Sequence, residues 1–312
     1  MPPESEVAIL APGVVRGATL PGRWKRRGRF NDLSALDEND LLGWAFGIRD
    51  ASLPAAPLHY LAMTGSDPAG YCLYAYPVYL HARREQLILM AGPEFEPNEQ
   101  EARELIASLR EHFPEWRFER TDDAMWFIIA DGDPELETTP LQKVLGENIN
   151  DHLPRGRDAM AWLKVLNELQ MVLFDSKVNQ ERESAGQPPV NSLWFWGGGR
   201  LPDIRGSHWQ RLVTNDPVAL GIGRRMGIET CWLDVARTGG PGAPDIATGD
   251  SLWAYRNPDP SDEAASVLSA EQWSRLRRAL QRREIGKLTL IEPGYGELTI
   301  DSGNRRSWLP WR

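Results

Sequence analysis

The sequence predicts a mixed α/β protein in which central sheets are flanked by helices. Short apolar runs typical of strands alternate with longer segments whose apolar residues recur at helical spacing. The chain of 312 residues has 41% hydrophobic and 25% charged residues, which is the composition of a globular protein with a substantial core. We expect an α+β domain over 1–135 and an α/β domain over 136–312, or one unit in which the two parts pack closely.

The first part alternates strands with two helices. The predicted elements are strands at 7–10, 58–63, 71–80, 86–90, 116–120 and 125–130 and helices at 35–46 and 96–112. The helix at 96–112 is well supported, because Ala102, Leu105 and Leu109 recur at helical spacing and acidic residues fill its first turn. The order strand–strand–helix–strand–strand predicts a layer with helices on one face. A basic run at 23–29 is interpreted as a solvated arm.

The second part has longer helices and single strands. The predicted elements are helices at 141–148, 158–183, 217–226 and 269–283 and strands at 193–196, 229–235, 251–255, 287–291 and 297–300. Asn215-Asp216-Pro217 is a strong helix start, with an Asx cap followed by proline in the first turn. We expect 238–248 to be a loop, and the Trp-rich tail at 305–312 to pack on the core or on another chain.

Charge and cysteine content exclude several classes of protein. The net charge of −9 argues against nucleic acid as the main partner, since nucleic-acid binding depends on positive surface. Cys72 and Cys231 lie far apart without metal-ligand spacing, which indicates free thiols in a reducing compartment. No apolar run reaches the ~18 residues of a membrane span, and the first residues show no signal-peptide pattern. We expect a cytoplasmic protein with neither membrane nor nucleic-acid partners.

The most unusual stretch runs from Lys177 to Pro202. It joins a polar helix end bearing Asn179 and Arg182 to a double proline, an apolar strand and a triple glycine. One interpretation is a tight corner after a buried strand, with solvated arginines beside it. The other is an anion site, in which glycine amides at a strand end and the donors of nearby arginines face a phosphate or carboxylate. The stretch is not a P-loop, because Gly-Lys-Ser/Thr is missing.

The same stretch resembles a known family. Asn179-Gln-Glu-Arg182, Gly186-x-Pro-Pro-Val-Asn191 and Trp196-Gly-Gly-Gly199 are similar to a pattern of the archaeal-type cofactor-independent phosphoglycerate mutases. The run Ser-Leu-Trp-Phe-Trp-Gly-Gly-Gly resembles the RpfE-type bacterial regulatory proteins more closely. The resemblance covers roughly residues 71–240. It implies the alkaline-phosphatase superfamily, whose mutases use two divalent metals held by Asp and His.

The departures from the mutase pattern concern the metals. The first strand ends in Ala11-Pro12-Gly13 where the mutases have an Asp-Gly ligand, and Asp133-Pro134-Glu135 stands in place of their Asp-Pro-His. No histidine follows His208, so their late ligands have no counterpart. The five histidines show no metal-ligand spacing and are interpreted as surface or satisfied side chains. We therefore expect a degenerate metal site, no catalytic residues and no cofactor.

Three functions follow from these observations. The first is a non-catalytic regulatory protein that binds a small phosphorylated or carboxylated metabolite, or a protein partner. Its predicted ligand-binding residues are Asn179, Arg182, Asn191, Trp196, Gly197, Gly198, Gly199 and Arg200. The second is an active phosphoglycerate mutase or phosphatase that holds Mn, Mg or Zn on Asp131, Asp133, Asp234 and Asp245. The third is a protein-interaction module that uses the basic arm, the arginines of helix 269–283 and the tail. The sequence leaves the oligomeric state open.

Overall fold

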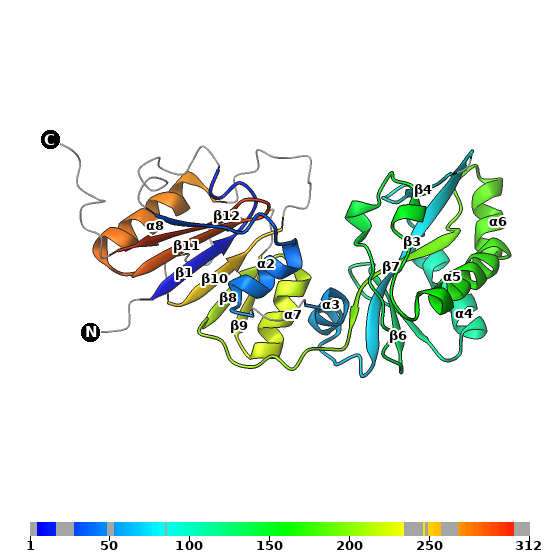
Figure 1. Ribbon diagram of the computed structural model, residues 1–312, viewed down its shortest axis with the longest axis horizontal. Coiled ribbons are helices and arrows are strands. Elements are labelled where there is room, and N and C mark those ends of the chain that lie inside the picture. The colour runs from blue at the N-terminus through cyan, green and yellow to red at the C-terminus, as the bar shows by residue number, and fades with distance from the viewer. Residues whose placement is uncertain are drawn as a thin grey trace. The chain divides into compact units, whose positions relative to one another are not determined.

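The chain divides into two compact units, of which the second is inserted into the first (Figure 1). The computed structural model describes residues 5–16, 28–48, 53–84, 86–233, 246, 249–256 and 268–302. Unit 1 comprises Met1–Leu53 and Asp203–Arg312, and unit 2 comprises Pro54–Pro202. The boundary expected near 135 falls inside unit 2, because strands on both sides of it pair with one central strand. Most of the basic arm, most of the loop at 238–248 and the Trp-rich tail lie outside the described residues.

Unit 1 contains a seven-stranded sheet in the order β2-β12-β11-β1-β10-β8-β9. The strands are β1 (Glu6–Leu10), β2 (Arg29–Asp32), β8 (Arg211–Thr214), β9 (Glu229–Trp232), β10 (Ser251–Ala254), β11 (Lys287–Glu292) and β12 (Gly296–Asp301). β1 lies between β10 and β11 and runs parallel to both, with Ile9 opposite Trp253 and Leu290. β12 pairs antiparallel with both β11 and β2. The parallel strands therefore share one carboxyl-terminal edge, where α/β proteins usually bind ligands.

Helices cover both faces of this sheet. The helices of unit 1 are α2 (Glu38–Ala45), α7 (Pro217–Met226) and α8 (Ala270–Arg282). α8 begins with a capping box formed by Ser269 and Gln272. The buried residues of α8 belong to a hydrophobic cluster that also includes Val213 of β8. Leu212, the residue before Val213 in β8, contacts α7. A Cβ added to Gly223 of α7 would lie 2.6 Å from Cδ2 of Leu212. Neighbouring residues of a strand point to opposite faces, so α7 and α8 lie on opposite sides.

Unit 2 is built around the 13-residue strand β3 (Tyr71–Arg83). Its other strands are β4 (Gln86–Met90), β5 (Arg117–Arg120), β6 (Trp126–Ala130) and β7 (Ser192–Gly199). The first half of β3 lies between β6 and β7, the second half pairs with β4, and all of these pairs are antiparallel.

The helices of unit 2 lie on both sides of this sheet. They are α3 (Ala55–Thr64), α4 (Glu99–His112), α5 (Ala159–Phe174) and α6 (Lys177–Ser184), with 3₁₀ turns at Leu141–Lys143 and Ile149–Asp151. Figure 1 shows α3 on one side of the sheet and α4, α5 and α6 on the other.

The mixed α/β class is confirmed, but several finer predictions are wrong. Helices lie on both faces of the unit 2 sheet rather than on one, and the helix predicted over 141–148 is only a 3₁₀ turn at Leu141–Lys143. The segment at 58–63, predicted as a strand, belongs to helix α3, whose buried residues lie on nearly every side and so give a continuous apolar run without helical periodicity. The helix predicted over 158–183 is two helices, because the chain turns at Asp175 and Ser176, and the Ser176 hydroxyl accepts a hydrogen bond from the amide of Asn179. In the described part of the chain, no helix is long and apolar enough to cross a bilayer.

Candidate functional site

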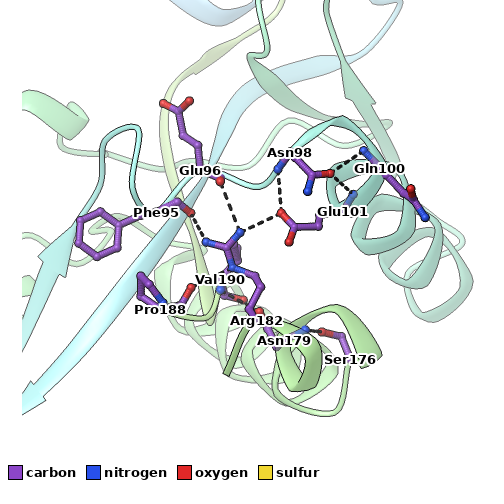
Figure 2. Close-up of polar contacts among 10 residues, drawn as sticks. All are labelled: Phe95, Glu96, Asn98, Gln100, Glu101, Ser176, Asn179, Arg182, Pro188 and Val190. Atoms are coloured by element: carbon purple, nitrogen blue, oxygen red, sulfur yellow. Dashed lines mark hydrogen bonds and ion pairs between the residues drawn. The ribbon is translucent and has the colours of Figure 1, made fainter. Parts of the chain in front are cut away.

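Arg182 is buried inside unit 2, where protein atoms bind its guanidinium group (Figure 2). The side chain is 4% exposed. Its Nη1 lies 2.8 Å from Oε2 of Glu101, and its Nε donates to the carbonyl of Pro188 at 2.9 Å. Nη1 and Nη2 also donate to the carbonyls of Glu96 and Phe95, each at 3.4 Å. The guanidinium group thus connects α6 to the start of α4 and to the loop after α6 that contains Pro188 and Pro189.

The two predicted asparagines bind backbone groups in the same way. Asn179 donates through Nδ2 to the carbonyls of Leu173 and Val190, at 2.7 and 2.8 Å, and its Oδ1 accepts from the amide of Val190 at 2.8 Å. Asn191 accepts from the amide of Leu80 at 2.7 Å and donates to its carbonyl at 3.0 Å. Both side chains hold the loop after α6 against its neighbours, as buried amides require.

The glycines at the end of β7 lie under bulky side chains. A Cβ on Gly198 would lie 2.6 Å from Oη of Tyr71, and one on Gly199 would lie 2.5 Å from Cβ of Pro54. Gly197 has a φ of +66° and lies against the ring of Tyr74. Trp196 is buried, with its ring centroid 4.7 Å from that of Tyr74. The triple glycine therefore permits close packing at this strand end. The predicted turn is wrong, because all three glycines belong to β7, whose pairing with β3 is irregular here.

Arg200 follows β7 and is the more exposed of the two predicted arginines, with 49% of its side chain accessible. Its Nε lies 2.5 Å from Oδ1 of Asp133, and its Nη2 donates to the carbonyl of Asp131 at 2.9 Å. Two members of the proposed metal set, Asp131 and Asp133, thus lie beside a cation. The other two, Asp234 and Asp245, lie outside the described residues.

The eight predicted ligand-binding residues form two groups. Asn179, Arg182 and Asn191 hold the loop of Pro188 and Pro189 before β7, whereas Trp196 to Arg200 lie at its other end. β7 has eight residues, so its two ends are roughly 23 Å apart. The structure does not bring both groups to one small ligand, and ligand binding by either group stays a prediction.

The carboxyl-terminal edge of the unit 1 sheet carries two buried carboxylates, Asp216 after β8 and Glu292 at the end of β11. Asp216 accepts through Oδ1 from the amides of Val218 and Ala219, and its Oδ2 lies 2.8 Å from Nε of Arg256. The sequence identified Asp216 only as a helix cap. It missed the ion pair because Arg256 lies on another strand end.

Glu292 is fully buried, and both of its oxygens are used. Oε2 accepts from the amides of Val15 and Arg16 at 2.7 and 2.8 Å, and Oε1 binds the guanidinium group of Arg16. It holds the turn that follows β1. Glu292 was not predicted as a functional residue, and the only signal for it in the sequence is its place directly after the apolar run that ends at Ile291.

These residues do not fit a two-metal centre. Both oxygens of Asp216 and of Glu292 bind amides or guanidinium groups, so each carboxylate already has a cation as its partner. Within the described ranges, no three His, Cys, Asp or Glu side chains gather as a metal site would require. The first strand is followed by Ala11 rather than by a ligand.

A second polar network, which the sequence analysis missed, lies between α3 and the sheet of unit 2. His59 is buried, with Nδ1 3.0 Å from Oη of Tyr74 and Nε2 2.6 Å from Oδ2 of Asp123. Oδ1 of Asp123 accepts from the Thr121 hydroxyl at 2.5 Å. Desolvation acts to raise the pKa of Asp123, but the hydrogen bond and charge of His59, with the bonds from Thr121 and Met125, hold this pKa below its ordinary value.

Comparisons with known proteins identify relatives by sequence. No protein-family model matches the chain. A 2,3-bisphosphoglycerate-independent phosphoglycerate mutase from Methanothrix thermoacetophila is 27% identical over 162 residues, which cover 48% of this chain and 41% of the relative. A probable mutase of the same name from Geobacter sulfurreducens is 29% identical over 106 residues, or 34% of this chain and 26% of the relative. The matches therefore span less than half of these relatives.

Two solved structures cover almost all of the chain. A protein from Pyrococcus horikoshii aligns at a TM-score of 0.58 and 12% identity, covering 96% of this chain and 87% of its own. A cofactor-independent phosphoglycerate mutase from Thermoplasma acidophilum aligns at a TM-score of 0.46 and 15% identity, covering 96% and 90%. At such low identity the first of these matches shows a shared α/β fold.

Proposed function

We propose that this chain is a non-catalytic regulatory relative of the phosphoglycerate mutases, of the RpfE type, that acts by binding an anionic metabolite or a protein partner. Its sequence relatives carry the mutase name, and the match covers less than half of their length. The proposal includes the absence of a metal cofactor, of a nucleic-acid partner and of a membrane partner. The cytoplasmic location stays a prediction.

One observation carries the proposal, namely that arginines and amides occupy the buried carboxylates at the carboxyl-terminal sheet edge. Phosphoryl transfer with two metals needs several carboxylate or imidazole ligands that converge on the ions. Arg256 binds Asp216 and Arg16 binds Glu292, so a guanidinium group neutralises each carboxylate. These ion pairs stabilise the strand ends.

Two measurements on the purified chain test the proposal. We expect substoichiometric Mn, Zn and Mg by metal analysis, and no conversion of 3-phosphoglycerate to 2-phosphoglycerate in a coupled assay supplied with Mn²⁺. The Methanothrix thermoacetophila relative serves as the positive control in the same assay. Turnover that depends on Mn²⁺ and disappears with chelator would overturn the proposal.

The alternative is an active mutase or phosphatase, and the names of the sequence relatives favour it. Its metal would lie on Asp131, Asp133, Asp234 and Asp245. If this alternative holds, Asp133→Asn abolishes both metal binding and turnover, whereas Asp151→Asn, which removes an exposed carboxylate elsewhere in unit 2, leaves both unchanged.

Titration with 3-phosphoglycerate in a calorimeter tests whether the chain binds an anionic metabolite or a protein partner. Arg200 is the predicted donor that lies nearest to solvent, because 49% of its side chain is exposed. We expect binding heat that Arg200→Ala removes and that Arg103→Ala, at an exposed arginine of α4, leaves intact. A lack of heat with the unsubstituted chain leaves the protein partner as the remaining form.

A further inference from the structure

Helix α5 carries an exposed stripe that the fold of unit 2 does not use. Met160, Lys164, Asn167, Met171 and Phe174 follow one another at alternating spacings of four and three residues, and all five are exposed. This spacing is that of the a and d positions of a coiled coil, so the five side chains lie along one line of the helix. We call these five residues the α5 seam.

The apolar residues of the seam are unusually exposed. Met160 is 69%, Met171 68% and Phe174 75% accessible. They make up three of the seven strongly exposed large hydrophobic side chains among the described residues. Scattered single residues of this kind need no explanation, but three on one helical line indicate an interaction surface.

The seam is not the side of α5 that builds the core. Trp162, Leu166, Leu169 and Leu173 form the opposite stripe and are buried in the core cluster shared with α4 and β7. Figure 1 shows α5 on the helical side of the unit 2 sheet. Folding of unit 2 therefore explains the inner stripe and leaves the outer one unexplained.

We propose that the α5 seam packs against the α5 seam of a second copy of this chain, as an antiparallel helix pair about a two-fold axis. In an isologous interface each contact occurs twice, so the surface must complement itself. Placing Met171 opposite Met160 of the second copy brings these two methionines together at both ends of the interface. The same register places Lys164 opposite Asn167 of the second copy, one residue from Glu168 of that copy, and the two-fold axis repeats this arrangement.

The charges select both the orientation and the partner. Glu168 is exposed next to the seam, one turn after Lys164, so the middle of the surface carries one positive and one negative group. A parallel pair would instead place Lys164 against Lys164, which is unfavourable for like charges at a seam. A polar border is also present, because Lys177, Gln180 and Glu181 line an open groove on the adjacent helix α6.

The first test measures the association of the full-length chain by sedimentation velocity over a range of concentrations. We expect a dimer that dissociates on dilution, and an association constant reduced by roughly tenfold or more in Met171→Asp and in Phe174→Ser. These side chains are exposed in the single copy, so thermal unfolding should change little. A chain that stays monomeric throughout overturns the proposal, as does a dimer that neither substitution weakens.

Charge exchange tests the register itself. Lys164→Glu and Glu168→Lys should each weaken the dimer, because each places like charges across the two-fold axis. An equimolar mixture of the two variants should associate again, since opposite charges then meet at both positions, and the double variant should also dimerise. Arg103→Glu on α4 serves as the control for a change in net charge. Failure of the mixture to associate, while the unsubstituted chain dimerises, overturns the antiparallel pairing.

Discussion

One carboxylate oxygen of Glu101 binds both α4 and α6. Its Oε2 accepts a hydrogen bond from the amide of Asn98 and lies 2.8 Å from Nη1 of Arg182. The first contact closes the capping box of α4, and the second joins α4 to α6. The Arg182 side chain is 4% exposed and that of Glu101 20%. Arg182, which the sequence predicts to bind an anionic ligand, therefore already binds the carboxylate of Glu101.

Arg182→Ala is expected to destabilise the protein strongly. The substitution leaves Glu101 without its partner and four hydrogen bonds of the guanidinium group unmade, and removal of one member of a buried ion pair costs about 3–5 kcal/mol. The midpoint of urea unfolding measures this loss. Arg103→Ala, in an exposed pair with Glu99, is the matched control and should cost less than about 1 kcal/mol. Equal midpoints for the two variants would contradict the structural role.

Gly198→Ala is expected to destabilise unit 2 by about 1–3 kcal/mol, since the new methyl group would lie 2.6 Å from Oη of Tyr71 and 2.8 Å from its Cε1. Combining it with Tyr71→Ala should cost less than the sum of the two single substitutions, because the double variant has no clash. Gly132→Ala, at a position with no atom within 4 Å and no positive φ, is the control. Additive costs in the double variant would show that the methyl group fits beside the tyrosine.

Asp123→Asn is expected to lower stability in a pH-dependent way. The pKa of Asp123 is lower in the folded protein than its ordinary value, so its ionised form contributes stability above the unfolded pKa of about 3.9, and this contribution is lost as the pH falls through the folded pKa. Thermal unfolding of both proteins between roughly pH 3 and pH 7 should show a gap that narrows toward the acid end. A gap that is constant with pH would contradict the assignment.

Cys72 is expected to react far more slowly with thiol reagents than Cys231. Burial raises the pKa of the Cys72 thiol well above its ordinary value, and its side chain is inaccessible on β3, whereas Cys231 is half-buried. Labelling of the native protein should modify one thiol quickly, and Cys231→Ser should remove that fast phase. The slow phase should become fast in denaturant. A fast phase that survives Cys231→Ser would show that Cys72 is accessible.

Local signals in the sequence were reliable where the chemistry is local. The cap of α7 at Asp216, the end of α7 at Gly227 and the capped start of α8 at Ser269 all lie where the sequence placed them. These features depend on residues within one turn of each other. Helix α3 was not predicted, because it is buried on nearly every side. Its sequence therefore lacks the alternation of apolar and polar residues that indicates a helix.

The candidate site could be predicted only in part. The sequence singled out Arg182, Asn179 and the triple glycine as unusual residues. The residues they contact, Glu101, Tyr71 and Pro54, lie far away in the chain, so the sequence did not show these contacts. The same limit applies to Glu292, whose partner Arg16 is 276 residues distant.

By itself the sequence determined the α/β class, most helix ends and strands, and the relation to the mutases through its central motif. These follow from periodicity, capping residues and identity, which are properties of neighbouring positions. Only the tertiary structure decided that donors in that motif bind protein atoms and that arginines hold the buried carboxylates at the sheet edge. The physical reason is that burial and ion pairing depend on which distant residues the fold brings within a few ångströms, and composition and spacing do not contain that information.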